Sequence, residues 1–211
     1  MPGCFIDHIT ITAPTLVAGA ALVREALGVA PQAGGEHPRM GTHNLLLKLG
    51  DSLFLEVISA NPNAPAPTRP RWFALDTLAP DSPPALSTWV VRTDNIDACA
   101  AACSEALGVV EPMSRGTLNW HITIPADGTL PLNGIAPALI EWQTEMHPAA
   151  KLHDHGLSLA RLELFHPEPA RVSRLLQSIG LEGPIPVSPA SDGRTARLIA
   201  HINTPQGIRV L

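Results

Sequence analysis

The sequence has few cysteines, no cluster of basic residues and no long apolar run. Its three cysteines, Cys4, Cys99 and Cys103, are an odd number and exclude a disulfide framework. The net charge of −5, with no grouped Lys or Arg, argues against a nucleic-acid or anionic-membrane partner. No apolar stretch reaches the roughly 20 residues of a membrane-spanning helix, and the first residues lack the features of a secretory signal. We therefore expect a cytoplasmic protein.

The composition is that of a globular protein, and an internal repeat organises it. Of the 211 residues, 45% are apolar and 16% are charged, which is enough for a sizeable core. The string Glu-Ala-Leu-Gly-Val occurs at residues 25–29 and again at residues 105–109. At the same offset of 80, the strand-like run 9–11 falls on residues 89–91. The chain therefore contains two similar units, each of which begins with a strand.

Each unit is predicted to continue with a helix and then with further strands. Apolar residues at helical spacing predict helices over residues 16–27 and 96–107. The residues expected to cap them are Thr15 and Asp94 at the start and Gly28 and Gly108 at the end.

The repeat also predicts the domain organisation. Residues 1–60 and 86–145 form paired modules of one strand, one helix and three strands. Residues 61–85 are rich in proline and are expected to be a surface connection, in which Trp72, Phe73 and Leu75 dock one turn onto the body. A looser third copy of the module occupies residues 146–211.

Strand alternation predicts which side chains face the cavity of the sheet. On the first strand Ile9 and Ile11 suit the helix side, which leaves His8 and Thr10 facing the cavity. A two-residue Gly50-Asp51 turn in the next hairpin places Glu56 and His43 on the cavity face and Leu46 on the helix face. His121 stands as far before Gly128 as His43 stands before Gly50, so it is expected at the same depth. A shift of one residue would reverse these assignments.

Five short segments carry a resemblance to a known superfamily. They are Asp7-His8-Ile9, Gly34-Gly35-Glu36-His37, Gly41-Thr42-His43-Asn44, Phe54-Leu55-Glu56 and Ile140-Glu141-Trp142. With the tandem repeat, they resemble the vicinal oxygen chelate superfamily and, within it, the glyoxalase-like domain family. The resemblance implies an α+β fold of tandem βαβββ modules, whose mixed, largely antiparallel sheet curls into a cup with helices outside.

The resemblance also implies a divalent metal ion in the cup, held by the first and last strands of two modules. The matching positions are His8, Glu56 and Glu141, and the fourth is Thr88, whose hydroxyl is a poor ligand for a transition metal. Two alternatives stay open: one histidine and two carboxylates hold an ion whose identity is unknown, or the pocket is polar and free of metal. Glu56 and Glu141 are the expected catalytic residues. The expected substrate pocket adds His37, His43, Thr88, Arg92, Trp120 and His121.

Two functions follow from this interpretation. The first is a metal-dependent lyase, isomerase or dioxygenase that chelates neighbouring oxygens of a small oxygenated metabolite. The alternative is a metal-free protein of the bleomycin-resistance type that sequesters a small molecule. Because cups form from pairs of modules, the third module suggests that the protein is a homodimer.

Overall fold

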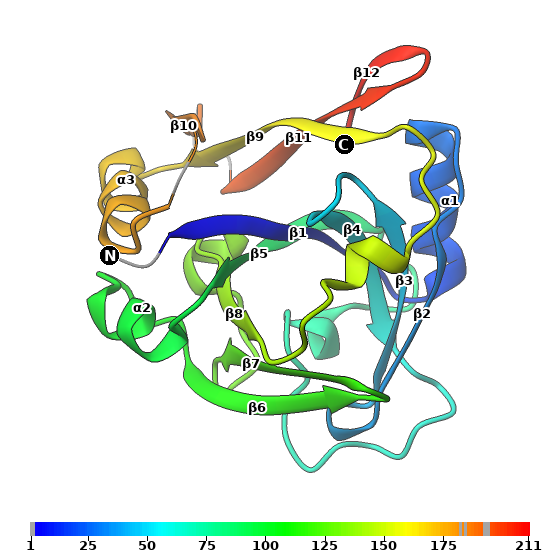
Figure 1. Cartoon of the computed structure of the whole chain (residues 1–211), viewed down its shortest axis with the longest axis horizontal. Helices are drawn as coiled ribbons and strands as arrows, with labels where there is room; N and C mark the ends of the chain where they lie inside the picture. Colours follow the sequence, from blue (N-terminus) through cyan, green and yellow to red (C-terminus); the bar gives the residue numbers. More distant parts are fainter. Residues whose placement is uncertain (1–2, 182, 184, 192–194) are drawn as a thin grey trace.

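Two sheets and three α-helices make up the part of the chain that the computed structural model describes, which is residues 3–181, 183, 185–191 and 195–211 (Figure 1). The larger sheet has eight strands in the order β2-β3-β4-β1-β5-β8-β7-β6, four from each of the first two modules. It curls into a cup, as the sequence predicts. The smaller sheet, in the order β10-β9-β11-β12, belongs to the third module.

The first module follows the predicted order of elements. They are β1 (Cys4–Thr12), α1 (Leu16–Leu27), β2 (Gln32–His37), β3 (Thr42–Lys48) and β4 (Phe54–Ala60). The Oγ1 atom of Thr15 accepts a hydrogen bond from the Ala18 amide at 3.1 Å, and Gly28 ends the helix with a φ of 76°. Both predicted caps of this helix are therefore confirmed.

The second module has the same order but a shorter helix than predicted. Its elements are β5 (Ala85–Thr93), α2 (Ile96–Ala102), β6 (Val109–Arg115), β7 (Leu118–Ile124) and β8 (Ala138–Trp142). Asn95, and not Asp94, is the N-cap. The residues just after the helix contact the third module instead: Ser178 accepts a hydrogen bond from the Ser104 amide, and Arg171 pairs with Glu105.

The two modules meet along β1 and β5, which run antiparallel and place Thr10 opposite Thr88. Each of these strands also pairs in parallel with the last strand of its own module, β1 with β4 and β5 with β8. Ile9 and Trp89 point from this seam to the convex side of the sheet and join its core. The opposite side chains of the same strands line the inside of the cup.

The third module lies against the convex side of the seam, near α1 and α2 (Figure 1). It consists of β9 (Ser158–His166), α3 (Pro169–Ser178), β10 (Val187–Pro189), β11 (Arg197–Thr204) and β12 (Gly207–Val210). Leu162, Leu164 and Ala200 are buried in the same core as Ile9 and Trp89. The third module therefore covers the middle of the large sheet and not an edge of it.

The proline-rich connection reaches into the cup. Trp72, Phe73 and Leu75 are buried in a second apolar cluster with Val90 and Ile122 from the inner face of the sheet. The predicted docking of this turn is confirmed. These side chains fill part of the cup, and the pocket that remains beside them is lined by residues of both modules.

The register of the first hairpin differs from the prediction by one residue. The amide of Leu49 bonds to the carbonyl of Leu53, so the loop has three residues and not two. Leu46 consequently pairs with Glu56, and Asn44 pairs with Ile58. Asn44, Leu46 and Glu56 face the inside of the cup, whereas the alternate residues face outward. Glu56 keeps its predicted side, but His43 and Leu46 exchange sides.

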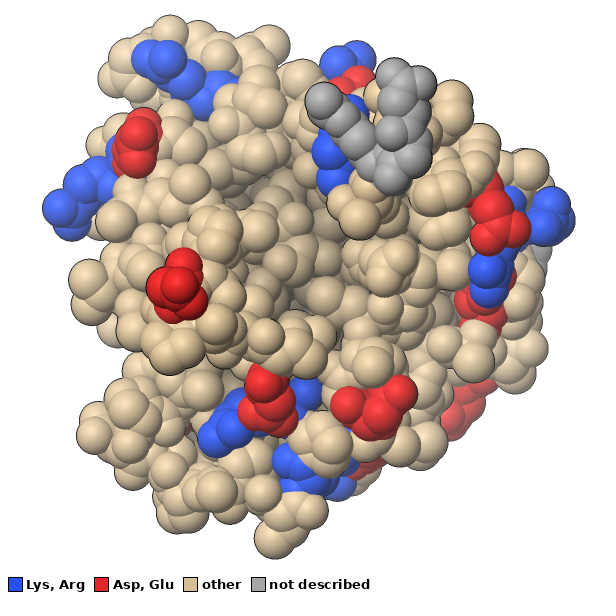
Figure 2. Space-filling model, turned by 180° about the vertical axis from the view of Figure 1, so that it is seen from behind, with Lys and Arg blue, Asp and Glu red and all other residues tan. Residues whose placement is uncertain are grey.

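Charged side chains are sparse on the face of the molecule seen from behind. Figure 2 shows that they stand mainly toward the periphery of this face, around a hollowed centre that carries almost none.

None of the helices in the described part of the chain combines the length and the apolar character that a membrane crossing needs.

Candidate functional site

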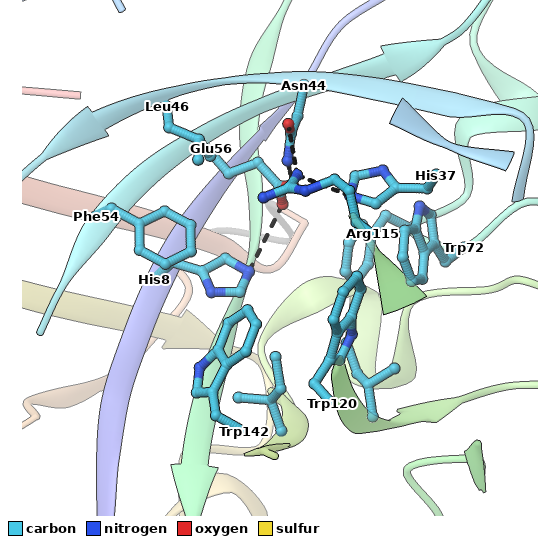
Figure 3. A pocket seen from close by; sticks show the side chains of 13 residues that line it. His8, His37, Asn44, Leu46, Phe54, Glu56, Trp72, Arg115, Trp120 and Trp142 are labelled. Carbon is cyan, nitrogen blue, oxygen red and sulfur yellow. Dashed lines mark hydrogen bonds and ion pairs between the residues drawn. The ribbon is translucent and has the colours of Figure 1, made fainter. Parts of the chain in front are cut away.

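One pocket inside the cup is lined by both modules and by the proline-rich connection (Figure 3). The cavity volume is about 30 Å³, which is room for the centres of only a few water-sized atoms, so the pocket as it stands suits a small ligand. Its polar residues are His8, His37, Asn44, Glu56 and Arg115. Its apolar walls are formed by Leu46, Phe54, Trp72, Phe73, Trp120, Ile122, Ile140 and Trp142.

His8 and Glu56 form the centre of the pocket. They come from β1 and β4, whose parallel register places Glu56 beside Thr10. The Nε2 atom of His8 lies 3.6 Å from Oε2 of Glu56, and both side chains are buried. Oε2 also accepts a hydrogen bond from Thr10 at 3.3 Å, while Oε1 accepts one from Nδ2 of Asn44 at 2.7 Å. These contacts hold the carboxylate in one orientation against the histidine.

Asp7 fixes the orientation of His8 from the other side of the ring. A β-bulge interrupts the pairing of β1 with β5 at this residue. Oδ1 of Asp7 lies 2.6 Å from Nδ1 of His8, and Oδ2 accepts hydrogen bonds from the Trp142 indole at 2.8 Å and from Nε2 of His147 at 2.9 Å. Burial alone would raise the pKa of this carboxyl, but the hydrogen bonds from His147 and His8 hold it well below its usual range.

The ionised Asp7 determines which nitrogen of His8 faces the pocket. Because a carboxylate only accepts, Nδ1 of His8 carries the proton that it shares with Asp7. Nε2 is then the nitrogen directed at Glu56. Figure 3 shows this edge of the ring turned toward the carboxylate.

Arg115 enters the pocket from the second module and reaches the first. Its Nη1 atom lies 3.2 Å from Nε2 of His37 and donates to Oδ1 of Asn44 at 3.0 Å. Burial, and then the charge of Arg115, lower the pKa of His37 to about 3. His37 is therefore neutral, with Nδ1 bonded to Thr42 at 3.0 Å and Nε2 free to accept from the guanidinium.

Two adjacent glycines on β2 clear the space for this contact. A Cβ atom on Gly34 would lie 2.2 Å from Oδ1 of Asn44, and one on Gly35 would lie 2.7 Å from Cδ of Arg115. The amide of Gly35 also donates to Asn44 at 2.9 Å. The Gly34-Gly35 pair therefore admits both polar side chains against the backbone of the strand.

The pocket contains four of the residues predicted from the sequence and excludes five. His8, His37, Glu56 and Trp120 line it. His43 and His121 lie on strands whose neighbouring residues Asn44 and Trp120 face inward, so both histidines face the convex side, against the prediction. The cause for His43 is the three-residue hairpin loop.

The other misplaced residues lie in separate surroundings. Thr88 is buried, but it lines a neighbouring small cavity together with Trp72 and Phe73. Arg92 does not line this pocket; it donates to the Ser52 carbonyl and covers the ring of Phe5.

Glu141 does not meet His8 and Glu56, and this part of the prediction is wrong. Its neighbours Ile140 and Trp142 line the pocket, so alternation along β8 turns Glu141 to the other face. There Oε2 accepts a hydrogen bond from the Ile96 amide at 2.8 Å, at the start of α2. Glu141 therefore satisfies a helix N-terminus and not a metal ion.

Sequence reasoning missed Asp7, Asn44, Arg115 and His147 as members of the site. Asp7 stands in the segment that carried the resemblance, so its position beside His8 was an available signal. Asn44 follows from the correct hairpin register. Nothing in the local sequence indicates that Arg115, or His147 from the segment after the second module, reaches this pocket.

Comparison with known proteins bears on the ancestry of this arrangement. The model of the glyoxalase-like domain family matches residues 6–180. The chain belongs to this family. The resemblance to the vicinal oxygen chelate superfamily is thereby confirmed for this glyoxalase-like protein. No curated protein matches the sequence.

Solved structures share the fold of the glyoxalase-like protein at low sequence identity. A hypothetical protein from Staphylococcus aureus is 12% identical, with a TM-score of 0.61 over 92% of this chain and 88% of that one, which shows a common fold. A variant of methylmalonyl-CoA epimerase from Streptomyces coelicolor is 21% identical over 67% of this chain and 96% of that one, with a TM-score of 0.46. A variant of 4-hydroxymandelate synthase from the same organism is 16% identical over 98% of this chain and 61% of that one, with a TM-score of 0.49. The last two similarities are too distant to bear on function.

The donor set of the glyoxalase-like protein does not fit a divalent metal ion. His8 and Glu56 supply two ligands, but the equivalent strand positions of the second module hold Thr88 and Ala138, beside Trp72 and Phe73. Among the described residues no group of three or more His, Cys, Asp or Glu could hold an ion. The guanidinium of Arg115 also lies in this pocket, and a positive charge opposes the binding of a cation.

Proposed function

We propose that this glyoxalase-like protein is an enzyme that moves a proton at a carbon next to a carbonyl group of a small oxygenated metabolite. Glu56 is the general base, Thr10 and Asn44 hold its carboxylate in place, and the unprotonated Nε2 of His8 accepts a share of the proton that Glu56 removes. The observation that carries the proposal is the continuous line of contacts Asp7–His8–Glu56, at 2.6 and 3.6 Å, which ends in the pocket.

The proposed step uses only side chains of the pocket. Glu56 takes the proton from the carbon and becomes a neutral acid, while the electron pair of the C–H bond moves to the carbonyl oxygen of the substrate. The proton returns to the same or another carbon by the reverse transfer. Asp7 keeps His8 in the tautomer that faces Glu56, as an orienting carboxylate does in other histidine-based sites.

The metal-dependent form of the function predicted from the sequence requires a third ligand. Glu141 was the residue proposed for that place, and it caps α2 instead. A lyase or isomerase reaction by proton transfer needs no such ligand, so we favour that reaction class over a dioxygenase.

Hydrogen–deuterium exchange tests the proposal directly. The protein is incubated in D2O with a panel of small aldehydes, ketones and oxo acids, and loss of the C–H signal next to the carbonyl is followed by NMR. We expect exchange of at least one compound, unchanged by a chelator, lost in Glu56→Gln and retained in Glu141→Gln. Exchange that vanishes with chelator, or that survives Glu56→Gln, contradicts the proposal.

A second candidate is a binding protein without chemistry, and the pocket walls favour it. Three of the four tryptophans, Trp72, Trp120 and Trp142, line the pocket and offer flat apolar surfaces to a ligand. A small apolar compound that raises the unfolding temperature, with no exchange of any panel member, supports this function. The homodimer stays a separate prediction, which light scattering tests.

A further inference from the structure

Arg115 makes no direct contact with a carboxylate among the described residues, whereas two neighbouring arginines do. At the same edge between the modules, Arg39 and Arg69 both pair with Glu111, the latter at 2.6 Å. Arg115 makes no ion pair with any carboxylate among the described residues, and its two protein partners, His37 and Asn44, are neutral acceptors. Burial lowers the pKa of Arg115, and the charge of Glu56 counteracts this without forming an ion pair. A partly buried guanidinium without an anion in direct contact is unusual, because desolvation of a charge is costly unless the charge is paired.

The hydrogen bonds of Arg115 leave much of its donor capacity unused. Both of its contacts with these residues start from Nη1, one to His37 and one to Asn44. Among the residues that the structure describes, Nη2 and Nε have no acceptor, and these two groups of a guanidinium match the two oxygens of a carboxylate.

The pocket holds the guanidinium in place as a preformed anchor. The neutral His37 and the amide oxygen of Asn44 both accept from it, and Gly35 leaves room for its stem. Asn44 links it in turn to Glu56 through a bond of 2.7 Å. An anion bound at Arg115 would therefore lie one side chain away from the proposed base.

Another buried donor among the pocket-lining residues also has no partner. The indole Nε1 of Trp72 forms no hydrogen bond within the described structure, although the side chain is almost fully buried. A buried donor without an acceptor is costly. Trp72 stands on the same side of the pocket as His37 and Arg115 in Figure 3.

We propose that Arg115 binds a carboxylate group of the substrate, so that the substrate class is small monocarboxylates whose remaining atoms reach His8 and Glu56 between the tryptophan walls. This inference rests on the proposed function only for the part of the substrate that reacts at Glu56. The anion site itself stands on the unpaired guanidinium, its neutral partners and the space that Gly35 provides.

A matched pair of probes of nearly equal shape isolates the charge. Propionate and propionamide are titrated into the full-length protein, and the indole N–H signals of the pocket tryptophans are followed by NMR, with the signal of Trp89, which lies in the convex core, as the internal reference. We expect saturable shifts with propionate and binding of propionamide that is about 10- to 100-fold weaker, the range for charge-assisted hydrogen bonds. Equal affinities, or no saturable shift with propionate, overturn the proposal.

Variants separate the anion site from the proposed reaction. Arg115→Met keeps the stem and is expected to abolish the preference for propionate, whereas Arg115→Lys keeps the charge without the planar fork and retains part of it. Glu56→Gln should bind propionate at least as tightly as the wild type, because a negative charge next to the ligand is removed.

If the wild type prefers propionate but Glu56→Gln does not alter exchange, the proposed function fails and the anion site stands. If Arg115→Met folds, as judged by urea unfolding, and keeps the preference, the anion site fails whatever the exchange experiment shows.

Discussion

Oδ1 of Asp7 lies 2.6 Å from Nδ1 of His8, although the two residues are adjacent in sequence and would normally point to opposite faces of a strand. The β-bulge in the pairing of β1 with β5 removes this alternation locally. As a result one carboxylate, which has no exposed surface, holds the ring that faces the pocket.

Asp7→Asn is expected to lower both stability and activity. An amide would direct an N–H group at one of the three donors that now converge on the carboxylate, from His8, Trp142 and His147. We expect a loss of about 1–3 kcal/mol in the free energy of unfolding, measured with urea at neutral pH. The exchange activity should fall about 10- to 100-fold with little change in KM. Asp127→Asn, in an exposed turn, is the control; equal effects of the two substitutions would contradict the role of Asp7.

His37 gives the stability of the protein a defined dependence on pH. Its pKa in the folded protein is about 3, whereas an unfolded histidine has its ordinary value of 6.5. Below pH 6.5 the unfolded chain therefore binds a proton that the folded protein does not. The contribution of this group is complete above pH 6.5 and is lost as the pH falls towards 3, by up to about 1.4 kcal/mol per pH unit.

The comparison of two histidine variants tests this dependence. Urea unfolding at pH 7.5, 6 and 5 should show a smaller decline with pH in His37→Gln than in the wild type. His153→Gln, at an exposed histidine, should decline as the wild type does. A decline in His37→Gln as steep as that of the wild type would show that other groups cause it.

Substitutions of the two glutamates that the sequence predicts to act together should have different effects on stability and exchange. Glu141→Ala removes the acceptor for the Ile96 amide and is expected to cost about 0.5–2 kcal/mol of stability, as for a lost N-cap, with the exchange rate unchanged. Glu56→Gln should abolish exchange. Urea unfolding and the D2O assay measure both effects, and a loss of exchange in Glu141→Ala at full folding would return Glu141 to the site.

The register of the first hairpin predicts opposite behaviour for two neighbours on β3. Asn44→Leu removes the donor to Glu56 and the acceptor for Arg115, so we expect a loss of about 2–3 kcal/mol of stability and of exchange activity. His43→Gln changes a residue outside the pocket and should alter stability by no more than about 0.5 kcal/mol. The same measurements on both variants check the register, which is wrong if His43→Gln is the more damaging.

Gly35→Ala should reduce ligand binding more than it reduces the stability of the fold. The new Cβ would lie 2.7 Å from Cδ of Arg115, a flexible side chain that can move. We expect a change of at most about 1 kcal/mol in stability, because alanine is otherwise no worse than glycine in a strand. The preference for propionate should be lost. In a double-mutant cycle Gly35→Ala adds nothing in the Arg115→Met background, and independent effects would contradict the close contact.

The sequence predicts the module architecture well, because that depends on patterns that repeat. The recurrence at an offset of 80, the cap of α1 by Thr15 and the alternation of Ile9 with His8 are local signals, and each is confirmed. The docking of Trp72 and Phe73 also follows from their apolar character within a polar, proline-rich stretch.

The site is predicted only in part, because its composition depends on details that local patterns do not contain. One extra loop residue after Gly50 exchanged His43 for Asn44 in the pocket. Glu141 was matched to Glu56 by its place near the end of a module, whereas the strand pairings make Ala138 the equivalent position. Arg115 and His147 arrive through tertiary contacts between distant parts of the chain.

The third module covers the apolar outer face of the cup, and this affects the solubility of the first two modules. A chain that ended at residue 156 would keep every side chain of the pocket, together with His147, yet it would leave Ile9, Trp89 and Val91 without the leucines that now cover them. Such a truncated protein would expose a continuous apolar surface on the convex side of the large sheet, and it would associate or precipitate. The C-terminal third therefore contributes no side chain to the lining of the pocket, but it covers apolar residues on the outer face of the cup that would otherwise be exposed to solvent.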